Sequence, residues 1–271
     1  MKKKTKNINY NYIFTLIFIL IIYIIYNLFN KKIEKFKIDD HKDIIIYTYG
    51  NEYKKFKTLA ESCDKNNVNI YMHGIGDKWI DYSNKLKNFH KFLENIEDTK
   101  IVMFVDGFDI IIFDNAENMK NKFLEFNKNL VFSAETYCWP DGEVNKYYPE
   151  KTKNERFRYV NSGTYMGYAK DLKEMLNSFR EKNYNCDTYP NKTNDKCDDQ
   201  RCLTYYYLNN IDKVALDHKQ KIWCVCAGTN REDFDLDINT YNNLYNKITN
   251  EKSSILHTNG WNKWYKELYI D

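Results

Sequence analysis

The chain has 271 residues, of which 29% are charged, and its formal net charge is +3 at pH 7. Basic and acidic residues are interleaved, which excludes the electrostatic footprint of a nucleic-acid-binding protein, so we expect no nucleic-acid partner. Leaving out the N-terminal segment, roughly 235 residues remain, which suits one domain with a sizeable core.

The N-terminal segment has the pattern of a membrane anchor. Residues 7–30 contain no charge, and the span at 12–30 is dominated by Ile, Leu, Phe and Tyr. That length suits a bilayer core about 30 Å thick. A cleaved signal peptide would have a shorter apolar region and a small-residue cleavage site, whereas Asn27-Leu28-Phe29-Asn30 is bulky. We therefore expect an uncleaved signal anchor that holds the protein to a membrane.

The resulting layout is a basic tail at 1–11, the anchor at 12–30, a charged linker at 31–42 and one domain at 43–271. Lysines flank both ends of the anchor, so the positive-inside rule gives only a preference in orientation. The simplest arrangement is a type II protein with its domain in the ER or Golgi lumen, or the equivalent in a virus-infected host. The sequon at Asn191 is relevant only in that lumenal arrangement.

The chain has seven cysteines. The spacing of Cys186, Cys197 and Cys202 does not match the common zinc patterns. A lumenal disulfide and plain buried thiols both remain open, and sequence alone cannot pair the cysteines.

Strands and helices alternate after the linker. Runs of β-branched residues predict strands, and apolar residues at helical spacing predict helices. We expect strands at 44–50, 68–72, 100–105 and 130–134, with helices between and after them at 52–67, 82–96 and 116–127. This alternation predicts an α/β fold with a mostly parallel sheet and helices on both faces.

The pattern is less regular after Glu135. The expected order is a loop-rich stretch at 137–159, a strand at 160–168, a helix at 170–182, a polar loop at 183–198, a helix at 199–208, and short strands around Val214, Ile222 and Ile255. No internal repeat is visible.

The most informative motif is the run IVMFVDGFD at 101–109, an apolar strand that ends in two carboxylates. Open α/β sheets bind ligands at the carboxyl ends of their strands. Asp106 and Asp109 can hold one divalent cation only if the chain turns between them, and Gly107 allows that turn. Aspartates that end strands are common, so these nine residues also fit a site with no metal.

Four later segments carry polar residues among aromatic or small ones. They contain Ser133-Ala134-Glu135 with Trp139, Asn161-Ser162-Gly163, Asp198-Asp199-Gln200, and His257-Thr258-Asn259-Gly260. Each has a structural interpretation as well: Asp198 as a helix cap, Trp139 as a core residue, His257 as a buried histidine.

Taken in order, FVDGFD, FSAETYCWP, NSGTYMGYA, DDQ and HTNG resemble the glycosyltransferase domain of the multifunctional procollagen lysyl hydroxylases. The resemblance also takes in Thr48 and the segment GIGDKW at 74–79, and it spans residues 43–265. It implies a Rossmann-like GT-A glycosyltransferase fold that uses a UDP-sugar and Mn²⁺.

The resemblance also implies roles for individual residues. By position, the metal ligands of the family match Asp106, Asp109 and His257. Its nucleotide-contacting residues match Thr48, Lys85, Phe108, Asn259 and Gly260, and Asp106 belongs to this group as well. The residues on its sugar and acceptor side match Trp139, Asp198 and Asp199. Phe108 stands where the family usually has a tyrosine that stacks on uracil. The acidic run before Gln200 is interrupted, as Asp195-Lys196-Cys197-Asp198-Asp199.

The expected function is transfer of a sugar, glucose first, from UDP-glucose or UDP-galactose to hydroxylysine or galactosylhydroxylysine of a collagen-like polypeptide. Transfer of galactose, construction of another surface glycan, and a non-catalytic nucleotide-sugar-binding membrane protein remain alternatives. The related family's hydroxylase activity is not expected, because His41-Lys42-Asp43 lies in the linker and no second domain follows it.

Overall fold

The computed structural model describes residues 44–181, 183–184, 197–260 and 268. The chain divides into two compact units, Met1–His41 and Lys42–Asp271, and the described residues belong to the second. Within them, none of the helices is both long and apolar enough for a membrane span. The expected tail, anchor, linker and sequon lie outside the described residues, so those predictions stay open.

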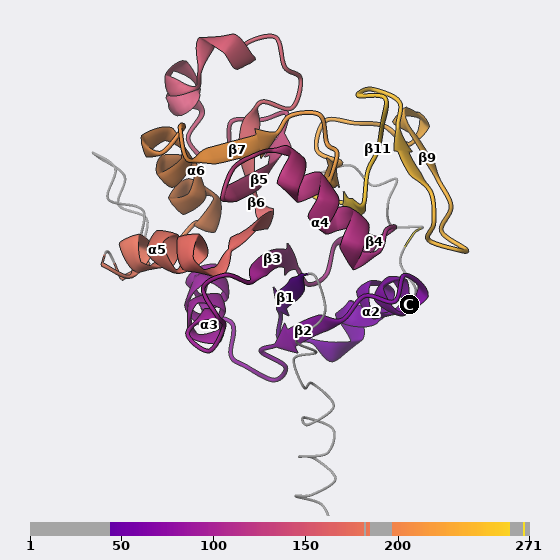
Figure 1. Cartoon of the computed structure of the whole chain (residues 1–271), viewed down its shortest axis with the longest axis horizontal. Helices are drawn as coiled ribbons and strands as arrows, with labels where there is room; N and C mark the ends of the chain where they lie inside the picture. Colours follow the sequence, from indigo (N-terminus) through magenta and orange to yellow (C-terminus); the bar gives the residue numbers. More distant parts are fainter. Residues whose placement is uncertain (1–43, 182, 185–196, 261–267, 269–271) are drawn as a thin grey trace, which may run out of the picture. The chain divides into compact units, whose positions relative to one another are not determined.

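A six-stranded mixed sheet forms the centre of the described unit, in the order β2-β1-β3-β6-β5-β7 (Figure 1). Its strands are β1 (Ile45–Tyr49), β2 (Ile70–His73), β3 (Ile101–Asp106), β5 (Leu130–Glu135), β6 (Tyr159–Tyr168) and β7 (Val214–Asp217). Parallel pairs join β1 to β2 and β3, and β5 to β7. The expected α/β fold is confirmed, but the sheet is mixed rather than mostly parallel, because β6 forms two antiparallel pairs.

One strand in the middle of the sheet, β6, runs antiparallel to both of its neighbours, β3 and β5. The sequence pattern did not predict this reversal. A parallel neighbour needs a crossover connection, usually a helix. The segment between β5 and β6 holds only the short 3₁₀ turns η2 (Gly142–Tyr147) and η3 (Glu150–Thr152), and the chain returns in the opposite direction.

Helices cover both faces of the sheet (Figure 1). Those in the described part are α2 (Lys57–Lys65), α3 (Ser83–Leu93), α4 (Ala116–Glu125), α5 (Ala169–Arg180) and α6 (Asp199–Asn209). One core contains apolar residues of α3, α5 and α6, and another those of α2 and α4. Alternate residues of β3 enter alternate cores, Phe104 the first and Val105 the second, as the period of a strand requires.

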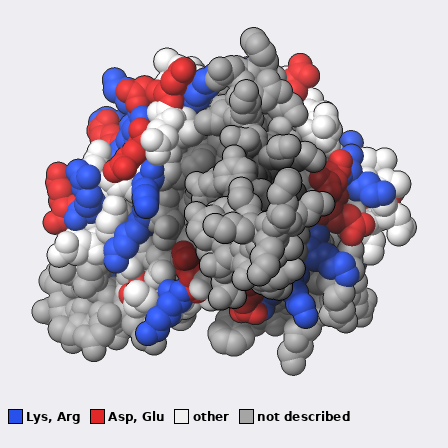
Figure 2. Space-filling view, turned by 90° about the horizontal axis from the view of Figure 1, so that it is seen from below, with Lys and Arg blue, Asp and Glu red and all other residues white. Residues whose placement is uncertain are grey.

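The helix expected at 52–67 begins with a 3₁₀ turn, η1 (Tyr53–Phe56), before α2. On the face shown in Figure 2, basic and acidic side chains lie interspersed, as they do along the sequence. Among the cysteines, Cys63 and Cys224 are buried thiols, whereas Cys202 is disulfide-bonded. Both expectations for the cysteines therefore apply, each to different residues.

Two smaller sheets complete the unit. The first has the order β4-β12-β8 and consists of β4 (Ile110–Ile112), β8 (Trp223–Val225) and β12 (Ile255–His257). The second has the order β11-β10-β9 and consists of β9 (Phe234–Leu236), β10 (Leu244–Asn246) and β11 (Glu251–Lys252). Short strands were expected around Ile222 and Ile255, where β8 and β12 lie, whereas β4, β9, β10 and β11 were not predicted. The antiparallel pair β4–β12 sets His257 opposite Ile110.

A protein truncated to begin at Lys37 should be soluble and active. The described core clusters are built from residues after 43, and the apolar span at 12–30 is expected to lie outside the domain. Soluble yield, thermal unfolding and sugar transfer of the truncated protein check this. Insoluble truncated protein, under conditions where the full chain folds in detergent, would show that the N-terminal segment is needed for packing.

Candidate active site

The candidate site lies at the edge of the central sheet where β1, β3 and β5 end. Asp106 and Glu135 are the last residues of β3 and β5, and Thr48 is next to last in β1. Because β6 is reversed, its first half lies at the same edge, and Thr164 pairs with Val105. The reversal therefore brings Gly163 to the strand ends that carry the carboxylates.

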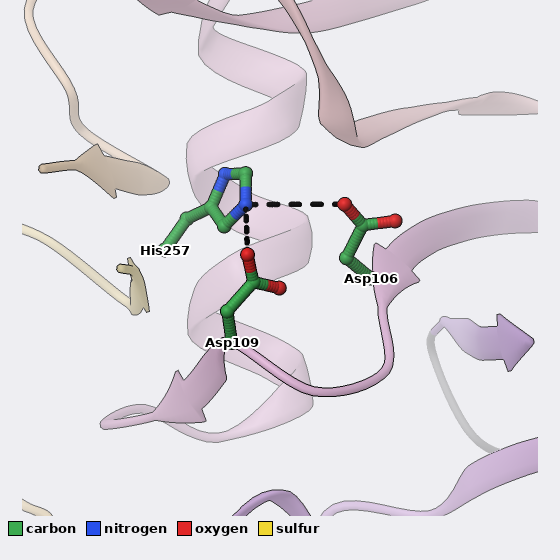
Figure 3. Close-up of side chains that lie close together, drawn as sticks. All are labelled: Asp106, Asp109 and His257. Carbon is green, nitrogen blue, oxygen red and sulfur yellow. Dashed lines mark hydrogen bonds and ion pairs between the residues drawn. The ribbon is translucent and has the colours of Figure 1, made fainter. Parts of the chain in front are cut away.

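Three of the predicted residues converge at this edge. Figure 3 shows that Asp106, Asp109 and His257 point toward one another. His257 Nε2 lies 3.2 Å from Asp109 Oδ2 and 3.9 Å from Asp106 Oδ2. Asp109 precedes β4 and His257 ends β12, so the β4–β12 pair is what brings residues so distant in sequence together.

The turn between the two aspartates depends on Gly107, though for a different reason from the one expected. Gly107 is not among the described residues with positive φ. A Cβ added at this position would lie 2.5 Å from the Phe56 ring and 3.3 Å from Thr48 Oγ1. Glycine is needed because the turn packs closely against these side chains.

The three side chains fit a divalent cation. One ligand atom from each lies within 4.8 Å of the others, and a cation that binds three ligands at about 2.1 Å needs them about 3–4 Å apart. Gly163 leaves the room required, because a Cβ there would lie 2.2 Å from His257 Cε1 and 2.9 Å from Asp106 Oδ2. Asp106, Asp109 and His257 could therefore hold a metal ion after small side-chain movements.

Burial and the neighbouring charges shift the pKa of each residue in this cluster. Burial lowers the pKa of His257, but the carboxylates of Asp109, Asp106 and Glu135 together outweigh this effect, and the pKa is raised. Burial raises the pKa of Asp109, yet His257 brings it below its usual value. Burial raises the pKa of Asp106 to about 6, against the opposing effect of Lys85. Binding of a metal ion at His257 would therefore compete with protonation of its imidazole.

Lys85 links this cluster to the start of α6. Its ammonium nitrogen lies 2.7 Å from Asp106 Oδ1 and 2.7 Å from Asp199 Oδ2. Burial alone would lower the pKa of Lys85, but the two carboxylates raise it above its usual value, so the side chain is charged. The structure thus brings predicted Lys85 and Asp199 together with Asp106, while their roles stay predictions.

Asp198 and Trp139 border the same region. Asp198 caps α6, and its carboxylate accepts from the backbone N–H of Arg201 at 3.2 Å, so the capping interpretation is confirmed. Burial, followed by the charge of Asp199, raises the pKa of Asp198. The Trp139 side chain is 63% exposed, so its interpretation as a core residue is wrong.

The predicted nucleotide-contacting residues lie at two places along the edge. Near the ends of β1 and β3, Phe108 packs edge-on against Phe56 with ring centroids 5.2 Å apart. The buried Thr48 hydroxyl has no hydrogen-bond partner among the described residues. After β12, Asn259 accepts from the Ala227 N–H at 3.1 Å, and Gly260 has φ of +91°, which favours glycine.

Two further residues of the site, Glu135 and Gln200, were not assigned a role from the sequence. The Glu135 carboxylate accepts from Gln200 Nε2 and, at 3.2 Å, from Asn259 Nδ2. Burial raises the pKa of Glu135 to about 7. Gln200 also accepts from the Ser162 N–H at 3.2 Å. The signal in the sequence was the position of Glu135 at a strand end, the same signal that singled out Asp106.

Replacing Gly163 by alanine should weaken metal binding by about tenfold or more, because the added methyl overlaps His257 and Asp106 and a misplaced ligand is costly. Gly142→Ala is the matched control, since a Cβ there meets nothing within 4 Å. Isothermal titration of both variants with Mn²⁺ measures the effect. Equal affinities in the two variants would show that Gly163 does not limit space at the metal site.

Comparison with known proteins finds a family model that matches most of the chain. A model of the family described as "PLOD GT domain" matches residues 39–269. An uncharacterized protein of Acanthamoeba polyphaga mimivirus is 29% identical over 208 residues, which cover 73% of this chain and 41% of that protein. The Caenorhabditis elegans multifunctional procollagen lysine hydroxylase and glycosyltransferase is 29% identical over 248 residues, covering 83% of this chain and 32% of that protein.

The mammalian relatives are similar to a comparable extent. The rat multifunctional procollagen lysine hydroxylase and glycosyltransferase LH3 is 26% identical over 200 residues, covering 69% of this chain and 25% of that protein. Among solved structures, a glycosyltransferase involved in glycosylation of the major capsid of PBCV-1 superposes with a TM-score of 0.45 at 13% identity, covering 81% of this chain and 94% of that one. The chain thus spans about a quarter to two-fifths of the length of these curated relatives.

Proposed function

This chain belongs to the PLOD GT domain family of glycosyltransferases, and on that premise we propose that it is a Mn²⁺-dependent GT-A enzyme with a UDP-sugar as donor. The proposed sugar is glucose, and the proposed acceptor is hydroxylysine or galactosylhydroxylysine of a collagen-like polypeptide. The observation that carries the proposal is the cluster of Asp106, Asp109 and His257 at the carboxyl edge of the sheet.

The donor would bind across the ends of β1, β3 and β12. Two carboxylates with one imidazole suit Mn²⁺ better than Mg²⁺ or Ca²⁺, because imidazole is the softer ligand. Bound Mn²⁺ would supply positive charge for the leaving diphosphate. Phe108 would stack on the uracil. The Thr48 hydroxyl, which has no hydrogen-bond partner among the described residues, would gain one there. Asn259 and Gly260 would lie against the diphosphate.

The sugar and acceptor would bind beside the start of α6. Lys85 keeps Asp199 and Asp106 a fixed distance apart, so the sugar side is coupled to the metal side. Asp199 would orient the sugar while its carboxylate stays bound to Lys85. Asp198 would accept the proton of the acceptor hydroxyl, because its raised pKa brings it closer to the operating pH.

A donor panel tests the function directly. UDP-glucose, UDP-galactose and UDP-xylose would each be offered with Mn²⁺ and a collagen peptide that bears hydroxylysine or galactosylhydroxylysine. Glucosyl transfer supports the proposal, and galactosyl transfer favours the alternative sugar. Hydrolysis of a UDP-sugar without transfer to these peptides would contradict the acceptor. Binding of UDP-sugar with neither transfer nor hydrolysis would indicate a non-catalytic binding protein.

We also propose that residues 12–30 anchor the enzyme as a type II membrane protein whose domain faces the ER or Golgi lumen. The apolar length of this span and the sequon at Asn191 support the layout. In cells, the full chain should carry an N-linked glycan that Asn191→Gln removes. A chain that sediments with membranes but carries no glycan, and is digested by protease added to intact microsomes, would contradict the lumenal orientation.

A further inference from the structure

A buried ion pair outside the metal cluster joins the loop after β5 to the first turn of α6. Arg201 donates from Nε to Asp141 Oδ2 at 2.7 Å and from a terminal nitrogen to Asp141 Oδ1 at 3.1 Å. The Tyr205 hydroxyl donates to the same carboxylate at 3.1 Å. Both charged residues are nearly inaccessible, with exposed fractions of 5% for Arg201 and 4% for Asp141.

This pair lies between the segments that carry the proposed sugar-side residues. Asp141 follows Trp139 by two positions, and Arg201 follows Asp199 by two. The backbone N–H of Arg201 donates to the Asp198 carboxylate at 3.2 Å. A further link runs from Gln200 Nε2 to the Trp139 carbonyl at 3.2 Å. The ion pair and this bond therefore both restrain the Trp139 loop, residues 136–141, relative to α6.

Stability alone does not account for such a pair. Removing two charges from water is costly, and apolar residues of similar size are often as stable or more so. The two parallel bonds of a guanidinium and a carboxylate instead fix distance and orientation. The Trp139 side chain cannot supply that constraint by packing, because it is 63% exposed. Polar contacts with α6 restrain this loop, and the ion pair supplies two of them.

We propose that Arg201 and Asp141 are positioning residues that hold the Trp139 loop at a fixed distance from Asp198 and Asp199. The inference rests on the proposed function. The metal ligands come from the β3–β4 turn and from β12, and Lys85 links them to the start of α6 through Asp106 and Asp199. Because the pair itself contains no metal ligand, it should affect sugar transfer more than the binding of Mn²⁺ and UDP.

The test uses the double variant Asp141→Leu/Arg201→Met of the full chain, which removes both charges of the pair together. Amides of 137–145 and 199–205 should exchange hydrogen faster by about tenfold, while those of β3 and β12 stay unchanged. The kcat of transfer should fall by about tenfold or more, because a displaced catalytic geometry is costly. The Kd for UDP in the presence of Mn²⁺ should stay within about twofold.

Two further variants complete the design. Arg201→Lys keeps the charge but loses the paired geometry, so it should increase hydrogen exchange and lower kcat by smaller factors. If the double variant does not fold, exchange, kcat and the Kd for UDP are measured on Arg201→Lys instead. Asp114→Leu/Lys122→Met removes a partly buried ion pair of 3.1 Å at α4 and is the matched control. It should leave exchange in 137–145 and the kcat of transfer unchanged.

The outcomes separate this inference from the proposed function. Unchanged exchange in both segments would overturn the positioning role, whatever the activity. Faster exchange with unchanged kcat, or a loss of UDP binding as large as the loss of transfer, would overturn it as well. Wild-type protein that neither binds UDP nor transfers sugar would refute the proposed function, and the exchange measurement would still decide whether the pair holds the loop.

Discussion

Replacing Asp106 by alanine is expected to abolish sugar transfer while leaving the fold largely intact. Asp106 is the last residue of β3, it contacts Lys85, and it points at His257 and Asp109 rather than into a core. A metal ion that stabilises the leaving group contributes several kcal/mol, so its loss should lower the rate by about a hundredfold or more. Circular dichroism and the transfer rate, measured on the same preparation, check both parts.

Asp98→Ala is the control for this variant. Asp98 is an acidic residue shortly before β3 whose side chain is 61% exposed and pairs with Lys173 at 2.7 Å. Losing an exposed ion pair costs about 1 kcal/mol or less, so this variant should transfer sugar normally. A folded Asp106→Ala protein with normal activity would remove the metal cluster from the mechanism.

The carboxylate half of the site could be predicted from the sequence because it is local. Asp106 and Asp109 belong to one motif, and a strand end with two acids is a readable signal. His257 lies 148 positions from Asp109 and meets it through strands of three residues each. Such short strands carry no period that reveals their pairing. The family resemblance, rather than any pattern in the chain, pointed to this histidine.

The remainder of the site depends on topology that the sequence pattern does not encode. The reversal of β6 brings Gly163 next to Asp106. The alternation of residues along a strand is the same for both strand directions, so the sequence pattern could not predict the reversal. The buried network of Glu135, Gln200 and Asn259 joins the ends of three elements, so none of its members has its partner nearby in the chain. Alternation of strands and helices, in contrast, is a local property, and it predicted the layers correctly.

Replacing His257 by alanine is expected to raise the half-saturating concentration of Mn²⁺ for transfer by about tenfold or more, with a smaller effect on folding. In the wild type, the neighbouring Asp109 raises the pKa of His257, so a proton competes with the metal. Lowering the pH should therefore raise the half-saturating Mn²⁺ concentration, by at most about tenfold per unit for one proton. In His257→Ala this competition disappears, and the dependence on pH should be weaker.

Titrations of activity with Mn²⁺ at fixed UDP-sugar, repeated at several pH values, measure both effects. His73→Ala is the control, since His73 ends β2 on the exposed surface and should leave the half-saturating concentration and its pH dependence as in the wild type. Asp106 and Asp109 remain in His257→Ala, so some metal binding should persist at high concentration. An unchanged half-saturating concentration in His257→Ala would make this residue a structural histidine, and the metal would then be held by the two aspartates of the β3–β4 turn alone.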